Sequence, residues 1–252
     1  MQQYSQTFQD LVNTATIETE KFYKTNSLET PNPYYIGKGN SRARIMIIGK
    51  ELAIDPTSKP AEFQNESVEN PLQWKKIIDG EETAFDPRLP YGEGYLPRPA
   101  GSTWRKYQLL SDLIFHTETS RPYFLHKFFI TEANTSPSKY SPGKKNIDFN
   151  SRIKFFKNSF YQNFDIIIVA AGGYLHVAQI EELFGVKEID RSQTTKNNKF
   201  IRLSDENQKK LVISTRQLSM AISPELMGRI ADEVSLWIRS LEPSKNMSNT
   251  SV

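Results

Sequence analysis

The sequence predicts an α/β protein, a three-layer α/β/α sandwich with a central, mainly parallel sheet of four to five strands. Near-continuous apolar runs recur along the 252 residues, and stretches with helical spacing of apolar residues separate them. Such runs are typical of strands that are covered on both faces. Because neither an internal repeat nor a linker interrupts the alternation, we expect a single domain over residues 1–242 and a disordered polar tail over residues 243–252.

Four apolar runs predict the strands of this sheet. The first is RIMII at 44–48, the second is KFFITE at 127–132, and the third lies within DIIIVAAGG at 165–173. The fourth lies within KKLVISTRQLS at 209–219. Residues 200–203 predict a further strand at an edge of the sheet.

Helices are predicted where apolar residues recur three or four positions apart. Asn70 with Pro71, and Ser223 with Pro224, are each typical of a helix cap followed by proline at the first helical position. The expected helices lie within residues 5–24, 70–78, 101–115, 148–162, 174–184 and 223–241.

A long segment, residues 52–100, contains seven prolines and is expected to be irregular apart from the helix at 70–78. Irregular segments of this length inside a compact domain are often functional. The aromatic residues Phe85, Tyr91 and Tyr95 favour an ordered loop that covers something.

The composition excludes several classes of chemistry. No cysteine is present, which removes thiolate nucleophiles, disulfides and zinc–thiolate sites. The three histidines do not have the spacing of a metal site, so we expect no metal and no cofactor, although carboxylate-bound magnesium stays open. Neither a signal sequence nor a membrane-spanning run is present, which predicts a cytoplasmic protein without a membrane partner. A net charge of +3 permits a nucleic-acid partner without requiring one.

The four strands all end in polar or glycine-rich turns. These turns are GKE at 49–51, TEANTS at 131–136, AAGG at 170–173 and STRQLS at 214–219. In a parallel sheet they lie along one edge, where open α/β sheets bind their ligands. None of them is a Walker loop, a GxGxxG fingerprint or a GxSxG elbow, which disfavours the common hydrolase and nucleotide-cofactor classes.

In their order, these turns resemble the uracil-DNA glycosylase superfamily over residues 40–240. Gly49, Lys50 and Glu51 are similar to its first motif of a glycine, a polar residue and an acid. The segment FFITEANTSPS is similar to its middle strand and loop, which implies that Asn134 lies near the base pocket. STRQLS resembles the last motif, of the type His-Pro-Ser-Pro, in position.

Two departures from the family pattern concern the expected activity on uracil. The histidine that supports the leaving base is replaced within Ser214, Thr215, Arg216 and Gln217. The asparagine and tyrosine that usually continue the first motif are also absent. The resemblance therefore implies a DNA glycosylase-like enzyme that acts on a modified or damaged base.

On this interpretation, cleavage of an N-glycosidic bond needs a carboxylate near the sugar and donors around the base. Glu51 would orient or deprotonate the attacking water. Lys50 and Arg216 would bind phosphates, and Arg216 would equally support charge on the leaving base. Asn134 would read the edge of the base, and Trp104 or a loop aromatic would stack on the flipped ring.

Each of these residues also has a structural interpretation. Gly49 is expected to let the chain turn after the strand, and Lys50 with Glu51 would form a surface ion pair. Trp104 would be a core residue, Asn134 would cap a turn, and Arg216 would pair with Glu51. The cluster of Lys139, Lys144 and Lys145 would be either a phosphate-facing loop or a solvated surface.

Three hypotheses for function follow. The first is a monomeric DNA glycosylase-like enzyme that binds single- or double-stranded DNA with a flipped base. The second is a non-catalytic nucleic-acid-binding module of the same fold. The third is an α/β enzyme that acts on a nucleotide or a sugar phosphate.

Overall fold

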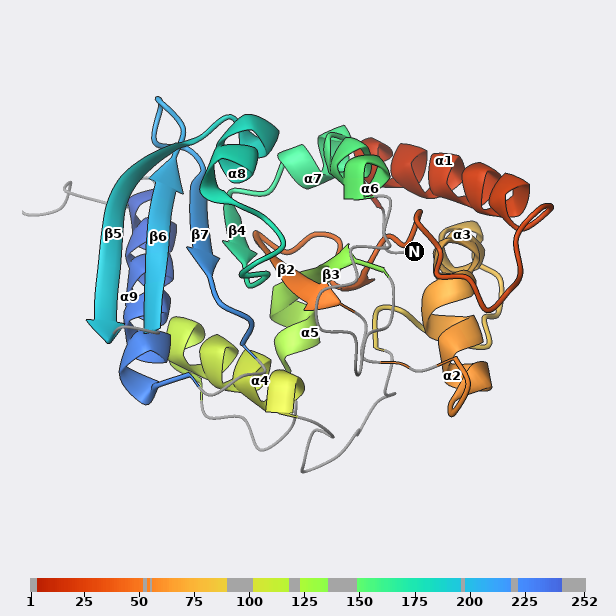
Figure 1. Cartoon of the computed structure of the whole chain (residues 1–252), viewed down its shortest axis with the longest axis horizontal. Coiled ribbons are helices and arrows are strands. Elements are labelled where there is room, and N and C mark those ends of the chain that lie inside the picture. Colours follow the sequence, from red (N-terminus) through yellow and green to blue (C-terminus); the bar gives the residue numbers. More distant parts are fainter. Residues whose placement is uncertain are drawn as a thin grey trace, which may run out of the picture.

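A computed structural model shows a mixed α/β protein with one sheet (Figure 1). Within the described residues, seven strands follow the order β1-β3-β2-β4-β7-β6-β5. Their bounds are Lys38–Gly39 (β1), Ile45–Glu51 (β2), Phe128–Asn134 (β3), Ile166–Val169 (β4), Lys187–Thr195 (β5), Asn198–Ser204 (β6) and Leu211–Thr215 (β7). The structure describes residues 4–51, 54, 56–89, 102–117, 123–135, 149–195, 198–218 and 222–241.

The centre of the sheet is parallel and its edges are antiparallel. Strands β3, β2, β4 and β7 are the four predicted strands, and they pair in parallel in that order. Strand β1 pairs antiparallel with β3, while β5 and β6 extend the other side antiparallel from β7. The prediction of four to five strands was too low, because β1 has only two residues and β5 is largely exposed and charged. Residues 200–203 belong to β6, which lies inside the sheet rather than at its edge.

Apolar side chains on alternate strand positions enter two separate cores. Ile45, Ile47 and Ile130 contribute to one core, whereas Met46 and Ile48 contribute to the other. This division follows from the two-residue period of a strand. It explains why the predicted strands are apolar at every position, since both faces of the sheet are buried.

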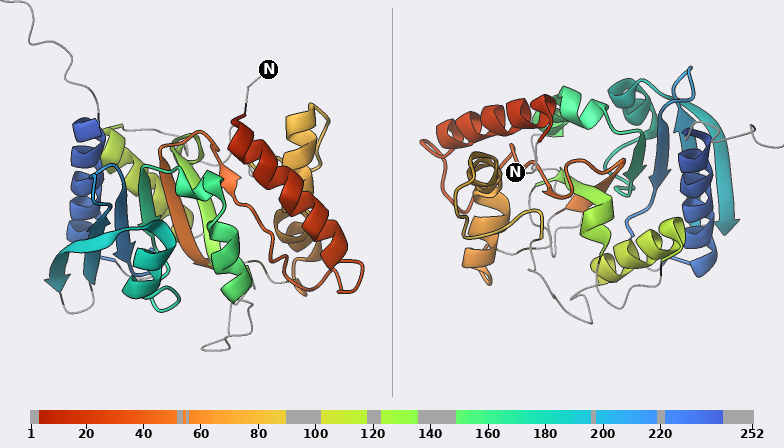
Figure 2. Two further views of the ribbon diagram at one scale, coloured as in Figure 1. Left: turned by 90° about the horizontal axis from the view of Figure 1, so that it is seen from above. Right: turned by 180° about the vertical axis from the view of Figure 1, so that it is seen from behind.

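Helices provide the other half of each core (Figures 1 and 2). Helices α1, α3, α6, α7 and α8 contribute to the core of Met46 and Ile48, and α4, α5 and α9 contribute to the core of Ile45 and Ile47. Their bounds are Gln6–Phe22 (α1), Asn70–Asp79 (α3), Ser102–Phe115 (α4), Phe124–Lys127 (α5), Phe149–Phe156 (α6), Ser159–Gln162 (α7), Val177–Phe184 (α8) and Pro224–Leu241 (α9). No helix in the described part of the chain is both long and apolar enough to span a membrane.

Three helix predictions needed correction. The expected helix at 148–162 is divided into α6 and α7, because Asn158 has extended backbone and its side chain accepts a hydrogen bond from the Phe160 amide. Residues 60–68, expected to be irregular, form helix α2 (Pro60–Phe63) and the π-helix η1 (Gln64–Val68). Asn70 is the first residue of α3 and not its cap.

The Asn70 side chain instead binds the backbone of a buried segment, residues 35–39, that leads into β1. Its Oδ1 accepts from the amides of Ile36 and Gly37, and its Nδ2 donates to the Gly37 carbonyl at 2.9 Å. Trp74 Nε1 also donates to this carbonyl. Buried backbone groups need such partners, so α3 is tied to the edge of the sheet through side chains.

Two glycines let this segment lie directly against β3. A β-carbon on Gly37 would lie 2.5 Å from the Ile130 carbonyl oxygen, and one on Gly39 would lie 2.4 Å from that of Phe128. Both residues also have positive φ, at +137° and +95°. Any side chain here would displace the segment from the sheet.

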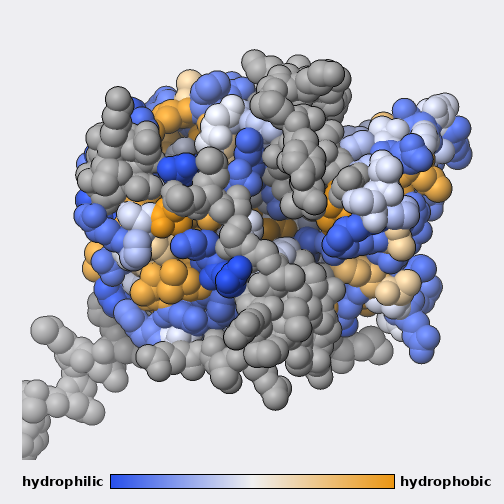
Figure 3. Space-filling view, turned by 60° about the horizontal axis from the view of Figure 1, so that its bottom comes forward, coloured by the Kyte–Doolittle hydropathy of each residue, from blue (hydrophilic) through white to orange (hydrophobic). Residues whose placement is uncertain are grey.

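The outer face of α4 and α9 carries the exposed leucines Leu109, Leu113 and Leu236. Figure 3 brings this side of the molecule forward, and its apolar patches are separated by hydrophilic residues. Scattered apolar residues of this kind are normal on a protein surface.

Substitution of Gly39 by alanine is expected to destabilise the fold by at least about 3 kcal/mol, because the new methyl group meets backbone. Gly80→Ala is the matched control, since Gly80 has φ of +78° but no atom within 4 Å of an added β-carbon. It should cost only about 1 kcal/mol. Urea denaturation of both variants measures the difference, and equal costs would show that close packing is not the constraint.

Candidate functional site

The polar ends of the four parallel strands lie side by side at one edge of the sheet. The register pairs Gly49 with Glu132, Glu51 with Asn134, and Val169 with Ser214. Since neighbouring strands are about 4.8 Å apart, the end of β7 lies about 10 Å from β2. The predicted convergence of these strand ends is therefore present in the structure.

Glu51 and Asn134 are register partners at the ends of β2 and β3. Asn134 is buried, with 2% of its surface exposed. Glu51 is the last residue of its strand, so its backbone position is set by pairing with β3. The two residues predicted to act on water and on the base are thus neighbours in the sheet.

Gly49 has a different role from the one predicted, because it lies inside β2 and not in a turn. A β-carbon at this position would lie 2.2 Å from Oε2 of Glu132 and 3.0 Å from its Oε1. The Glu132 carboxylate therefore occupies the space above the Gly49 backbone. A side chain at position 49 would therefore displace the Glu132 carboxylate from this place.

The charge of Glu132 acts on two buried phenols, those of Tyr35 and Tyr107. Burial first, and then the negative charges of Glu132 and Glu66, raise the pKa of Tyr35 well above its usual value. Burial and then the charge of Glu132 do the same for the pKa of Tyr107. Both phenols consequently remain protonated.

A buried ion pair continues this group of residues along the edge of the sheet. Lys38 Nζ lies 2.5 Å from Glu66 Oε2, and the two side chains are only 3% and 5% exposed. Lys38 comes from β1, whereas Glu66 comes from the π-helix η1. We refer to Tyr35, Lys38, Glu66, Tyr107 and Glu132 together as the carboxylate cluster.

Trp104, a residue of α4, packs against the ion pair of Lys38 and Glu66. Lys38 Nζ lies 5.2 Å from the centre of its ring, a cation–π distance. The ring also packs against Tyr107 and, at 5.3 Å between centres, Phe124. These contacts agree with the structural interpretation, in which Trp104 is a core residue.

Arg152 anchors the opposite face of β3 without an ion pair among the described residues. Its guanidinium donates to the carbonyls of Glu132 and Tyr35, at 3.0 and 2.6 Å, and to Thr131 Oγ1 at 2.7 Å. Burial lowers the pKa of this guanidinium. Arg152 therefore holds the end of β3 and the segment before β1 in one arrangement.

Lys50 lies within β2, and its side chain reaches the turn that follows β4. Its Nζ is 4.6 Å from the centre of the Tyr174 ring. The intervening Gly172 approaches β7 closely, because a β-carbon there would be 3.0 Å from Arg216 Cα. The two predicted phosphate-binding residues are thus on either side of one glycine turn.

The remaining predicted residues lie at the end of β7. Thr215 is buried, and its hydroxyl donates to the carbonyl of Lys199 in β6 at 3.2 Å, which joins the end of β7 to the neighbouring strand. Ser214, Arg216 and Gln217 are half-buried. Among the described residues, the register places Gly49 and Asn134 on one face at the ends of β2 and β3, whereas the Lys50 side chain lies on the opposite face, over Tyr174. The residues at the end of β7 lie two strands away from β2.

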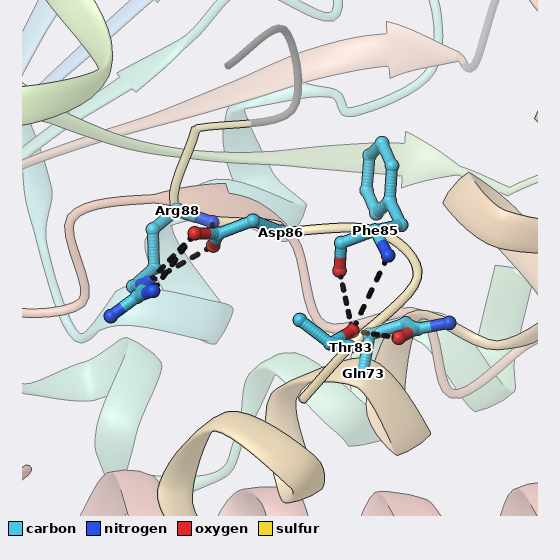
Figure 4. A network of polar contacts seen from close by, with 5 residues as sticks. All are labelled: Gln73, Thr83, Phe85, Asp86 and Arg88. Carbon is cyan, nitrogen blue, oxygen red and sulfur yellow. Dashed lines mark hydrogen bonds and ion pairs between the residues drawn. The ribbon is translucent and has the colours of Figure 1, made fainter. Parts of the chain in front are cut away.

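The segment at 83–88 lies near α3 and the beginning of β3 rather than over the strand ends. Thr83 contacts Gln73 and the Phe85 backbone, and Asp86 forms a bidentate ion pair with Arg88 (Figure 4). The Gly39 amide donates to Pro87. This corrects the expectation that Phe85 covers the site. Tyr91, Tyr95, Lys139, Lys144 and Lys145 lie outside the described residues.

A cavity of about 510 Å³ lies beside this segment. It is lined by residues that precede β2 and β3, among them Asn40, Ser41 and His126, together with Asp86 and Arg88. It therefore opens at the amino-terminal side of the parallel strands. In the part of the chain that the structure describes, no group of three metal-ligating side chains is present.

Sequence reasoning missed Lys38, Glu66 and Arg152 because each lies far along the chain from its partners. Lys38 and Glu66 are 28 positions apart, and Glu66 was in a segment expected to be irregular. Glu132 lies in the recognised strand end TEANTS but received no role. Its pairing with a glycine on the neighbouring strand is visible only in the sheet register.

The chain matches no protein-family model. A search of curated proteins finds no match either. The geometry of the strand ends is therefore the basis for a functional proposal.

Substitution Lys38→Met is expected to lower the free energy of unfolding by about 3–5 kcal/mol, because it leaves the buried Glu66 carboxylate without its counter-charge. The double variant Lys38→Met/Glu66→Leu should be more stable than Lys38→Met alone. Lys21→Met, which removes an exposed ion pair with Glu18, is the control and should cost less than about 1 kcal/mol. Denaturation curves test this, and additive losses in the double variant would contradict the coupling.

Proposed function

We propose that this protein is a DNA glycosylase-like hydrolase that cleaves the N-glycosidic bond of a modified or damaged base. The observation that carries the proposal is the pairing of Glu51 with Asn134 at the carboxyl ends of β2 and β3. A glutamate that can act on water and an asparagine that can contact the base thereby occupy neighbouring backbone positions, which supports the proposed reaction.

The order of the parallel strands supports a ligand site at this position. Strand β2, the first of them, lies between β3 and β4, so the chain passes to one side of β2 and then to the other. Crevices form at the carboxyl edge where such a reversal occurs, and ligands bind there. Gly49, Lys50 and Glu51 belong to this edge.

Within the proposed reaction, each residue has a limited task. Glu51 orients the attacking water and stabilises positive charge that develops on the sugar. Asn134 contacts the base edge with its amide. Lys50 and Arg216 bind the phosphates on either side of the flipped nucleotide, which positions the substrate without reading its sequence.

The proposal includes the finer description of the fold as a three-layer α/β/α sandwich and its resemblance to the uracil-DNA glycosylase superfamily. Two cores on opposite faces of the sheet support the layered description. The segment from Ser214 to Gln217 follows the last parallel strand, as the last motif of that superfamily does, but it lacks the histidine. A modified base other than uracil is therefore the proposed substrate.

Substitution Glu51→Gln is expected to lower the rate of base release about 10²- to 10⁴-fold, because the amide does not act as a general base. The assay follows free base from oligonucleotides that carry a panel of modified bases. Glu20→Gln, an exposed glutamate on α1, is the matched control and should retain the rate of the unchanged protein. Equal rates for both variants would contradict the assignment of Glu51.

If no base in the panel is released but DNA binding persists and weakens with salt, the protein is the non-catalytic binding module instead. Thermal stabilisation by nucleotides or sugar phosphates, with no response to DNA, would indicate the small-molecule enzyme.

Substitution Arg216→Ala is expected to weaken DNA binding and to reduce the slope of log K against log salt by about one unit, because one phosphate contact is lost. Arg42→Ala is the control, since Arg42 is exposed before the amino end of β2, at the opposite edge of the sheet. Fluorescence anisotropy at several salt concentrations gives both slopes. A larger effect of Arg42 would place the DNA on the other side of the molecule.

A further inference from the structure

We infer that Glu132 makes this site selective for a base that presents hydrogen-bond donors, namely a ring N–H beside an exocyclic amino group. This inference deepens the proposed function and rests on it. It assigns to Glu132, on the strand next to Glu51, direct contact with the edge of the base.

The position of the Glu132 carboxylate is the first observation. Both of its oxygens lie within 3.0 Å of the point where a β-carbon of Gly49 would stand. The carboxylate is therefore held over β2, two residues before Glu51 and beside the pair formed by Glu51 and Asn134. The residue as a whole is half-buried but its Oε2 is buried, and Tyr35, Lys38, Glu66 and Tyr107 are buried.

The Tyr35 hydroxyl is an independent second observation. Tyr35 is fully buried, and within the described structure its hydroxyl has no hydrogen-bond partner. Burial first, and then the negative charges of Glu132 and Glu66, raise the pKa of this hydroxyl well above its usual value. Buried hydroxyls without a partner usually indicate a missing water or ligand group.

The chemistry of a carboxylate sets the class of ligand. An ionised glutamate only accepts hydrogen bonds, so it attracts N–H groups and repels carbonyl oxygens. The N1–H and 2-amino group of a guanine-type base match such an acceptor. Uracil, whose edge carries two carbonyl oxygens around one N–H, does not. The site should therefore favour amino-bearing bases.

A purely structural role for Glu132 would be to balance the charge of Arg152. Arg152, however, donates to the main-chain carbonyl of Glu132 and to Thr131, on the face of the sheet away from α4. The Glu132 carboxylate lies over Gly49, and its charge acts both on Tyr107 of α4 and on the buried Arg152 guanidinium. A readout of base selectivity separates the two roles, because charge balance alone does not distinguish one base from another.

The test compares the affinities of the full-length protein for deoxyguanosine monophosphate and deoxyinosine monophosphate. These ligands differ only in the 2-amino group. Titration calorimetry should show at least about tenfold tighter binding of the guanine nucleotide, as expected for a hydrogen bond to a charged acceptor. The panel of oligonucleotides should show the same preference in base release.

Two variants remove the selectivity by different means. Glu132→Gln keeps the shape of the side chain but loses the charge, and Gly49→Ala keeps the charge but displaces the carboxylate. Both should reduce the preference to less than about threefold, a loss comparable to one charged hydrogen bond. Glu20→Gln should leave it unchanged, and thermal unfolding confirms that each variant is folded.

Equal affinity of the unchanged protein for the two nucleotides, or an unchanged preference in both variants, would overturn the inference. Release of another modified base that depends on Glu51, without any guanine-type preference, would overturn it while the proposed function stands. Loss of base release in every assay, with a preference in binding that depends on Glu132, would overturn the proposed function and support the selectivity.

Discussion

The arrangement of this protein depends on the burial of residues 35–39 against the edge strand of the parallel sheet. A buried backbone segment must have its amides and carbonyls satisfied. Asn70 and Trp74 of α3, Tyr161 of α7 and Arg152 of α6 provide these hydrogen bonds. Three helices are thereby joined to one segment, which is itself pressed against β3. Loss of this segment would separate the helices from the sheet at the position where the candidate site lies.

Residues 35–39 also contribute side chains to the carboxylate cluster. They include Tyr35 and Lys38, and they pass the end of β3 near Glu132. Lys38 and Glu66 are a buried ion pair, and loss of either charge would destabilise the fold. The remaining charge would be buried without a partner, and its desolvation is costly. The two carboxylates of the cluster are balanced by Lys38 and by the nearby Arg152 guanidinium. A carboxylate acceptor near Asn134 suits donor groups on a ligand better than carbonyl oxygens.

Much of the fold is readable from the sequence for one physical reason. A parallel strand that is buried on both faces contains a continuous apolar run, and β2, β3, β4 and β7 each begin with at least three consecutive apolar residues. The strands that escaped prediction lack it, since β1 is a lysine and a glycine and β5 is largely exposed and charged. Pairing with a neighbour, rather than local propensity, makes these residues strands.

For the candidate site, the sequence alone specifies which residue types follow each strand, including Gly49, Glu51 and Asn134, and it predicts that they share an edge. It does not specify which of them touch. The tertiary structure decides that Gly49 lies beneath the carboxylate of Glu132, and that Lys38 neutralises Glu66 from 28 positions away. Register between strands and the pairing of buried charges are long-range properties. They depend on how the whole sheet packs, and no local pattern encodes them.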